Sequence, residues 1–156
     1  MAARKAVEQS FKEFYMKKIA MIAVVLVVAL AAVSARDKIV SADQLPKTAQ
    51  DFISAHFAGK TVQYVEKDFN EFEVQLSDRT EIEFGGNGEW ESVKSYEGIP
   101  AGVLPEAITS YVKKNFADAK IVEAEMDWNG IELKLSNRME VFFDKDGTYR
   151  GQKYDD

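Results

Sequence analysis

The sequence contains no cysteine and a single histidine, His56. Without thiols the chain can form no disulfide, no thiolate metal site and no cysteine nucleophile, and it offers no sulfur for lipid attachment. One histidine cannot build a metal cluster, so we interpret His56, near the end of a predicted helix, as a helix-end or core-edge residue. Stability must therefore come from a hydrophobic core, which the 46% of apolar residues can supply.

The sequence also lacks a long hydrophobic run. Its longest, residues 19–33, is shorter than the roughly 20 residues that a membrane-spanning helix needs. Lys17 and Lys18 precede this run and small residues follow it, which is the pattern of a secretory signal peptide. An uncleaved N-terminal anchor is the alternative.

These features predict the N-terminal organisation of the chain. Residues 1–15 are expected to be an upstream extension, residues 16–35 the signal peptide, and residues 36–44 the mature N-terminal segment. The product is then periplasmic or secreted, with no stable membrane span after signal cleavage.

The chain has fewer basic than acidic side chains. The chain has 20 basic and 26 acidic side chains, a net charge of −6. Residues 1–35 hold five of the basic and two of the acidic ones, so the remainder has 15 against 24 and a net charge of −9. Such a balance argues against a nucleic-acid partner, because the phosphate backbone needs a cationic surface.

An internal duplication is the strongest signal present. Placing Leu45-Pro46 on Leu104-Pro105, an offset of 59 residues, aligns the two halves without a gap over some 50 residues. We therefore predict one structural unit at 45–98, a linker at 99–103 and a second unit at 104–156.

Each unit is predicted to hold one helix and four strands. Apolar residues recur at helical spacing from Leu45 to Phe57 and from Leu104 to Phe116. Alternating stretches follow at about 60–69, 71–77, 79–84 and 89–96, and again 59 residues later. The predicted fold class is α+β, with two tandem α-β-β-β-β repeats forming an antiparallel sheet whose helices pack on one face.

This pattern resembles the PepSY-like family of periplasmic proteins, whose members share the fold of the β-lactamase inhibitory protein. The resemblance rests on Leu-Pro opening each helix, Phe57 and Phe116 closing it, paired Glu-x-x-Leu and Arg-x-Glu motifs, and paired turns. The turns are Asp68-Phe69-Asn70, Asp127-Trp128-Asn129, Gly85-Gly86-Asn87-Gly88 and Asp144-Lys145-Asp146-Gly147. The resemblance implies export, tandem repeats and a binding or inhibitory role, and it supplies no catalytic motif.

Turn chemistry predicts which side chains share a face of the sheet. An Asn129-Gly130 hairpin would set Trp128 opposite Ile131, and by the repeat Phe69 opposite Phe72. The other two turns of the first unit would pair Phe84 with Trp90, Leu76 with Thr80 and Val74 with Ile82. All these choices place the apolar residues under the helices and leave a polar face uncovered.

The uncovered face yields the candidate site. One row of the first unit is predicted to read Asp68, Glu73, Glu83 and Glu91, and its counterpart Asp127, Glu132, Phe142 and Arg150. Like charges opposite one another cost free energy, so these four predicted carboxylates form either a binding patch or a solvated surface. Candidate binding residues are Asp68, Glu73, Glu83, Glu91, Glu132, Phe142 and Arg150.

Three functions are compatible with these sequence features. The first is an exported, non-catalytic module that binds a protein partner, and inhibits it, through the open face. The second is a calcium-responsive protein, with Asp68, Glu73, Glu83 and Glu91 as metal candidates, because calcium takes oxygen ligands. A hydrolase is the least favoured, because carboxylates on an open sheet lack the shelter that raises a catalytic pKa. Asp144-Lys145-Asp146-Gly147 resembles a calcium loop, but it lacks the terminal glutamate and is interpreted as a hairpin turn.

Overall fold

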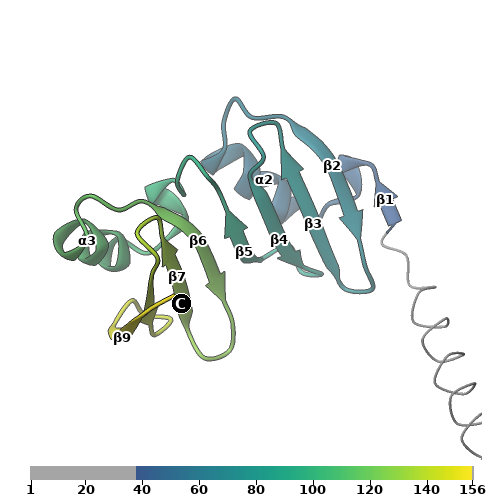
Figure 1. Ribbon diagram of the computed structural model, residues 1–156. Coiled ribbons are helices and arrows are strands. Elements are labelled where there is room, and N and C mark those ends of the chain that lie inside the picture. Colours follow the sequence, from purple (N-terminus) through teal and green to yellow (C-terminus); the bar gives the residue numbers. More distant parts are fainter. Residues whose placement is uncertain (1–37, 156) are drawn as a thin grey trace, which may run out of the picture. The chain divides into compact units, whose positions relative to one another are not determined.

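A computed structural model describes residues 38–155 (Figure 1). The predicted extension, the signal peptide and residues 36–37 lie outside the described residues, so those predictions stand as they were made. Between residues 38 and 155, no helix has the length and apolar character that crossing a membrane requires.

The described chain folds into nine strands, two α-helices and two short 3₁₀ turns. The helices are α2 (Lys47–His56) and α3 (Glu106–Asn115), and the 3₁₀ turns are η1 (Ala42–Gln44) and η2 (Ala101–Val103). The strands are β1 (Lys38–Val40), β2 (Val62–Lys67), β3 (Glu71–Leu76), β4 (Glu81–Gly85), β5 (Trp90–Lys94), β6 (Ile121–Met126), β7 (Ile131–Leu135), β8 (Met139–Phe143) and β9 (Tyr149–Tyr154).

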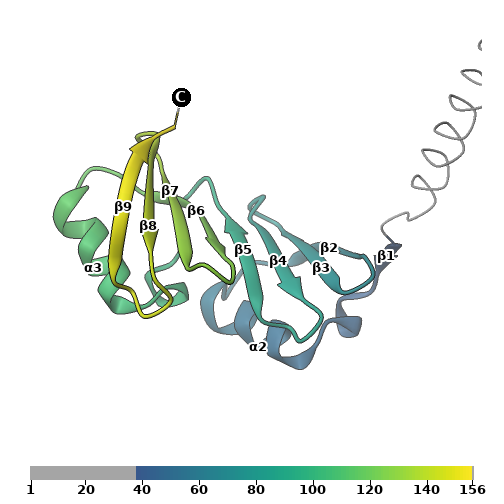
Figure 2. The same ribbon diagram turned by 90° about the horizontal axis from the view of Figure 1, so that it is seen from below.

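The strands form one antiparallel sheet in simple sequence order, from β1 to β9. Both helices pack on the same side of this sheet, α2 behind the first strands and α3 behind the last ones (Figures 1 and 2). The α+β class, the antiparallel sheet and the one-sided helices are thereby confirmed.

The elements repeat at the predicted offset of 59 residues. The two α-helices are 59 residues apart at both ends, and so are η1 and η2 and the starts of β2 and β6 and of β5 and β9. The units join edge to edge through β5 and β6, where Val93 pairs with Ala124. The unit boundaries at 45–98, 99–103 and 104–156 remain a prediction.

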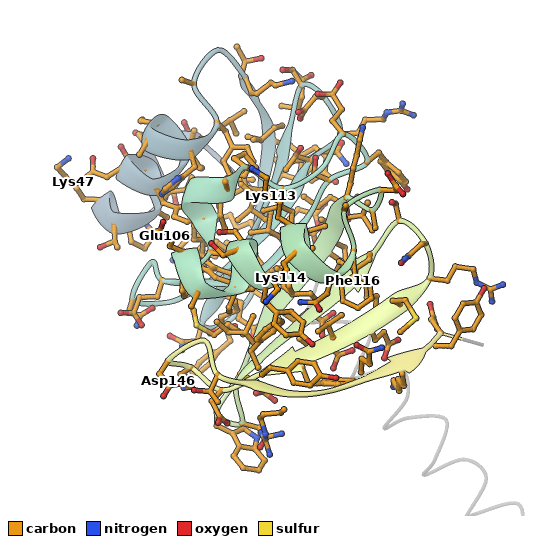
Figure 3. All side chains as sticks on the ribbon, turned by 90° about the vertical axis from the view of Figure 1, so that its left-hand side faces the viewer. Lys47, Glu106, Lys113, Lys114, Phe116 and Asp146 are labelled. Atoms are coloured by element: carbon orange, nitrogen blue, oxygen red, sulfur yellow. The ribbon has the colours of Figure 1, made fainter. Side chains whose placement is uncertain are left out.

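A continuous apolar core lies between the helices and the sheet. The helices contribute Ala49, Ile53, Ile108 and Val112, all buried. Each isoleucine or valine side chain contributes about 1.5–3 kcal/mol when fully buried, so this layer is the main source of stability in a chain without disulfides. The outer helix faces stay polar: Lys47 points away from the sheet (Figure 3) and pairs with Asp51.

Equivalent aromatic trios tie each helix to its strands. In the first unit Phe52 packs edge-on against Phe84, with ring centroids 5.7 Å apart, and stacks on Trp90 at 6.4 Å. The second unit repeats this trio with Tyr111, Phe143 and Tyr149. These ring contacts hold each helix against the strands beneath it.

Two of the three predicted turns have the expected register. Phe84 pairs with Trp90 and Val74 with Ile82, and the Leu76 N–H donates to the Thr80 carbonyl oxygen at 2.8 Å.

The prediction for the remaining turn is wrong. Asp68 pairs with Glu71, so the two-residue loop is Phe69-Asn70, and Phe69 does not lie opposite Phe72. Phe69 is 98% exposed, and its equivalent Trp128 is 87% exposed.

The physical reason is the aspartate that opens each of these turns. Asp127 Oδ1 accepts hydrogen bonds from the backbone N–H groups of Asn129 at 2.7 Å and Gly130 at 3.0 Å. In the first unit Asp68 Oδ1 accepts from the Phe69 N–H at 2.7 Å. Such side-chain bonds fix a turn that begins at the aspartate and carries the aromatic residue out to the tip.

Candidate functional site

The uncovered face of the sheet carries a row of carboxylates that crosses both units. In cross-strand register the row reads Glu66, Glu73, Glu83, Ser92, Glu125, Glu132, Phe142 and Gly151. We call its five glutamates, Glu66, Glu73, Glu83, Glu125 and Glu132, the acidic row. Like charges that face each other across strands repel, so this arrangement costs stability in the isolated protein.

The row differs in membership from the predicted one. Glu73 and Glu83 are neighbours as predicted, and so are Glu132 and Phe142. Placing Asp68 in the same row was wrong, because the turn begins at Asp68 and Glu66 takes the position opposite Glu73.

The same one-pair shift removes Asp127 from the predicted second row, where Glu125 lies opposite Glu132. Glu91 and Arg150 leave the rows for a different reason. Each sits at the irregularity where β4 meets β5 or β8 meets β9, and Ser92 and Gly151 take the register positions instead.

Two equivalent depressions lie along the row. The first, about 200 Å³, is lined by Glu66, Asp68, Glu71, Phe72, Glu73 and Glu83. The second, about 390 Å³, includes the residue 59 positions after each of these: Glu125, Asp127, Gly130, Ile131, Glu132 and Phe142. The exposed rings of Phe69 and Trp128 stand at the turns that border the two depressions.

The two depressions carry different charges. The first is lined by five acidic residues and by Phe72, whose buried side chain belongs to the core side of the sheet. In the second, Phe142 replaces Glu83 and Arg150 adds a cation. The Arg150 guanidinium donates to the Asn129 backbone oxygen at 2.8 Å and lies 3.4 Å from Asp144 Oδ1. Acidic residues therefore outnumber basic ones more strongly in the first depression than in the second.

Two glutamates of the acidic row in the second unit, Glu125 and Glu132, have raised pKa values. A hydrogen bond with Glu123, together with partial burial, raises the pKa of Glu125. Partial burial and then the nearby Glu140 charge raise the pKa of Glu132. Burial would also raise the pKa of Glu123, but the hydrogen bond with Glu125 and the positive charges of nearby lysines lower it overall. Burial and the carboxylates of the neighbouring row therefore favour the protonated forms of Glu125 and Glu132.

The next row of the same face is, in contrast, charge-balanced. It alternates in sign across six strands as Glu81, Lys94, Glu123, Lys134, Glu140 and Lys153. Glu123 lies within 3.5 Å of Lys94 and 3.2 Å of Lys134, and buried Glu140 lies 2.6 Å from Lys153. The fold thus pairs opposite charges in one row and leaves the neighbouring row acidic.

The remaining sequence candidates have structural explanations. His56 is half-buried beside Phe52, with ring centroids 4.8 Å apart, and a Cβ atom on Gly102 would lie 3.2 Å from its Nδ1 atom. Asp144-Lys145-Asp146-Gly147 forms the β8–β9 hairpin, in which the Gly147 N–H donates to the Asp144 oxygen at 2.9 Å. Over residues 38–155 no three histidine, aspartate or glutamate side chains are grouped so that they could hold a metal ion.

Two residues of the acidic row are absent from the row predicted from the sequence. Glu66 and Glu125 were missed, although both lie at strand positions two residues before the aspartates that were chosen. Their alternation with buried Val65 and Ala124 is a signal that could have found them.

The repeat, the one-sided helices and the uncovered polar face define a tandem-repeat α+β class of protein, and comparison with known proteins agrees. The family described as "Putative beta-lactamase-inhibitor-like, PepSY-like" matches residues 31–84 and 70–150. The chain belongs to this PepSY-like family. No curated protein sequence matches the chain.

Solved structures of Bacteroides proteins are similar over most of their length. One from Bacteroides thetaiotaomicron, named a "putative calcium-regulated periplasmic protein", shares 34% identity, with a TM-score of 0.71, over 77% of this chain and 98% of that one. A second, from Bacteroides vulgatus and named as a periplasmic protein of unknown function, shares 32% identity with a TM-score of 0.69, over 75% and 98% of the two chains. Like these relatives, the chain is a periplasmic protein.

Proposed function

We propose that the protein is a non-catalytic binding module that holds a basic protein partner on the uncovered face of its sheet. The acidic row is the observation that carries this proposal. Repulsion between its glutamates is a cost that a cationic partner would relieve.

The exposed aromatic turns add to this proposal. Phe69 and Trp128 are large apolar side chains left in water beside the two depressions. Aromatic side chains are enriched among the residues that dominate binding free energy at protein interfaces. A partner with basic side chains over the first depression and apolar pockets for these two rings would match the surface, and an exported enzyme inhibited in this way is one such partner.

Capture from periplasmic extract of the source bacterium tests the proposal. We expect the immobilised wild-type chain to retain a defined protein, identified by mass spectrometry, and Glu83→Lys to reduce its recovery at least about tenfold. Reversing one central charge adds a like-charge contact, which costs on the order of 1–3 kcal/mol at an interface.

The matched control is Glu106→Lys, the same charge reversal at an exposed residue of α3 on the helical side. It should leave recovery unchanged. Equal recovery by wild type and both variants, or no protein retained above background by the wild type, would contradict the proposal.

Calcium binding is the second candidate, because one relative carries calcium in its name and five carboxylates line the first depression. Against it, residues 38–155 hold no ready-made group of metal ligands. A site with a Kd of about 10 µM would add about 2.7 kcal/mol of stability at about 1 mM calcium. We expect the Tm to change by less than about 1 °C on adding that concentration, with magnesium as the control cation, and a larger calcium-specific rise would favour the calcium function.

Catalysis has less support than binding. The raised pKa of Glu125 and of Glu132 is what a general acid needs. However, the hydrogen bond that raises the pKa of Glu125 ties this side chain to Glu123 of the charge-balanced row, and the second depression is lined by no serine, threonine, cysteine or lysine. The arrangement offers a crowded acidic surface and no nucleophile with an adjacent base.

A further inference from the structure

The sheet ends in two edge strands, β1 and β9, and the repeat relates both edges to its interior. β5 and β9 are equivalent strands, and so are β6 and β2. Inside the sheet β5 pairs with β6, with Val93 opposite Ala124. The chain therefore contains one example of the junction by which the last strand of one unit adds to the first strand of the next.

β1 occupies on β2 the place that β5 occupies on β6. Val40 lies opposite Val65, just as Val93 lies opposite Ala124, the equivalent of Val65. Val40 is only partly buried against the core, whereas Val93 is fully buried, and the neighbouring Ile39 is 71% exposed. The edge of β2 is thus a site to which a strand can add. In this chain the three-residue strand β1 occupies the site, which we call the seat.

β9 of a second copy has a charge that suits this seat. It carries Arg150 and Lys153 and no acidic residue. In the register of β5 on β6, Gly151 would lie opposite Glu66 and Lys153 opposite Tyr64. The two cations of β9 would then border the acidic side of the first unit.

Two features of β9 weaken this pairing relative to the internal junction. Gln152 would stand opposite Val65, where the internal junction has Val93, and Arg150 would lie opposite Lys67. Polar and charged residues on an edge strand are the usual protection against strand addition. The short β1 therefore suffices to hold the seat in the intact chain.

We propose that β1 caps a strand-addition site on β2 whose other occupant is β9 of a second copy, joining copies head to tail. Such a junction uses two different surfaces, so copies add head to tail, into an open chain or, where the rotation between copies closes, into a ring. The proposal concerns the edges of the sheet and is independent of the protein-binding role of its uncovered face.

Releasing β1 in the full-length chain tests this proposal by sedimentation velocity over a range of concentrations. Val40→Asp places a charge against Val65 and should free the seat, so the weight-average mass should rise with concentration to more than about twice that of the monomer. Gln44→Asp, which adds the same charge at an exposed residue of η1, should behave as wild type.

A second substitution identifies the donor strand. The Ser95 N–H donates to the Val122 oxygen across the internal junction, so the Val93 N–H, two residues earlier, faces the same way. The equivalent Gln152 N–H then faces the open edge, where proline removes a donor without disturbing β8. Adding Gln152→Pro to Val40→Asp should restore the monomer.

The outcomes separate clearly. A folded Val40→Asp variant that stays monomeric, or that stops at a dimer unaffected by Gln152→Pro, overturns the proposal. If circular dichroism shows Val40→Asp unfolded, Gln152→Val in the chain with intact β1 decides instead. That variant restores the apolar residue of the internal junction and should raise the mass at high concentration; an unchanged mass overturns the proposal.

Discussion

Replacing Gly130 with glutamate is expected to lower the free energy of unfolding by about 2–4 kcal/mol. Gly130 adopts a φ of 147°, and a Cβ atom there would overlap the backbone oxygen of Phe143. The residue 59 positions earlier is Glu71, which pairs with Gly85 without this conflict. Urea denaturation of the purified variant measures the effect.

Gly151 provides the control for this substitution. A Cβ atom at Gly151 meets nothing within 4 Å, so Gly151→Ala should change the free energy of unfolding by less than about 0.5 kcal/mol. A Gly130→Glu variant as stable as Gly151→Ala would mean that the β6–β7 turn can relax to the geometry of β2–β3. The close approach of a Cβ atom at position 130 to Phe143 would then not limit the stability of the protein.

Replacing Val93 with glutamine is expected to destabilise the protein by about 2–4 kcal/mol. Val93 is fully buried and pairs with Ala124 at the junction of the two units, where an amide would find no partner among the surrounding apolar side chains. The equivalent position in the second unit already holds an exposed glutamine, Gln152. Comparing the free energy of unfolding of a variant at Val93 with that of a variant at Gln152 therefore isolates the contribution of the junction to stability.

The reciprocal variant Gln152→Val supplies the control for stability. Measured at low concentration, where copies remain apart, it should change the free energy of unfolding by less than about 0.5 kcal/mol, because β9 is an edge strand. Loss of stability in Gln152→Val as large as in Val93→Gln would show that residue type, and not the junction, sets the effect.

Most of the fold could be predicted because its signals are local. Period-2 alternation placed Phe72, Val74, Ile82 and Phe84 on the core side, and all four are buried. The turns after Leu76 and Phe84 followed from their spacing, and Arg79 takes the positive φ of 67° that its turn requires. β1 was not predicted, since three residues carry too little periodicity to be recognised.

The candidate site was less predictable, because it depends on which residues face each other across strands. One misplaced hairpin loop moved Asp68 into a row that belongs to Glu66. The error left the faces of the strands intact, since a shift of one pair keeps the alternation, but it changed the neighbour of Glu73 on β2 and the neighbour of Glu132 on β6. The bulges at Glu91 and Arg150 had the same effect at the other end of the rows.

The sequence alone determined the duplication, the order of helix and strands and the separation of apolar from acidic faces, because each is written in residue spacing along one chain. Only the tertiary structure decided that Glu66 and Glu125 complete the acidic row, that lysines neutralise the next row, and that β1 fills the seat on β2. These depend on pairing between strands, which is set by turn hydrogen bonds and by contacts between segments distant in sequence.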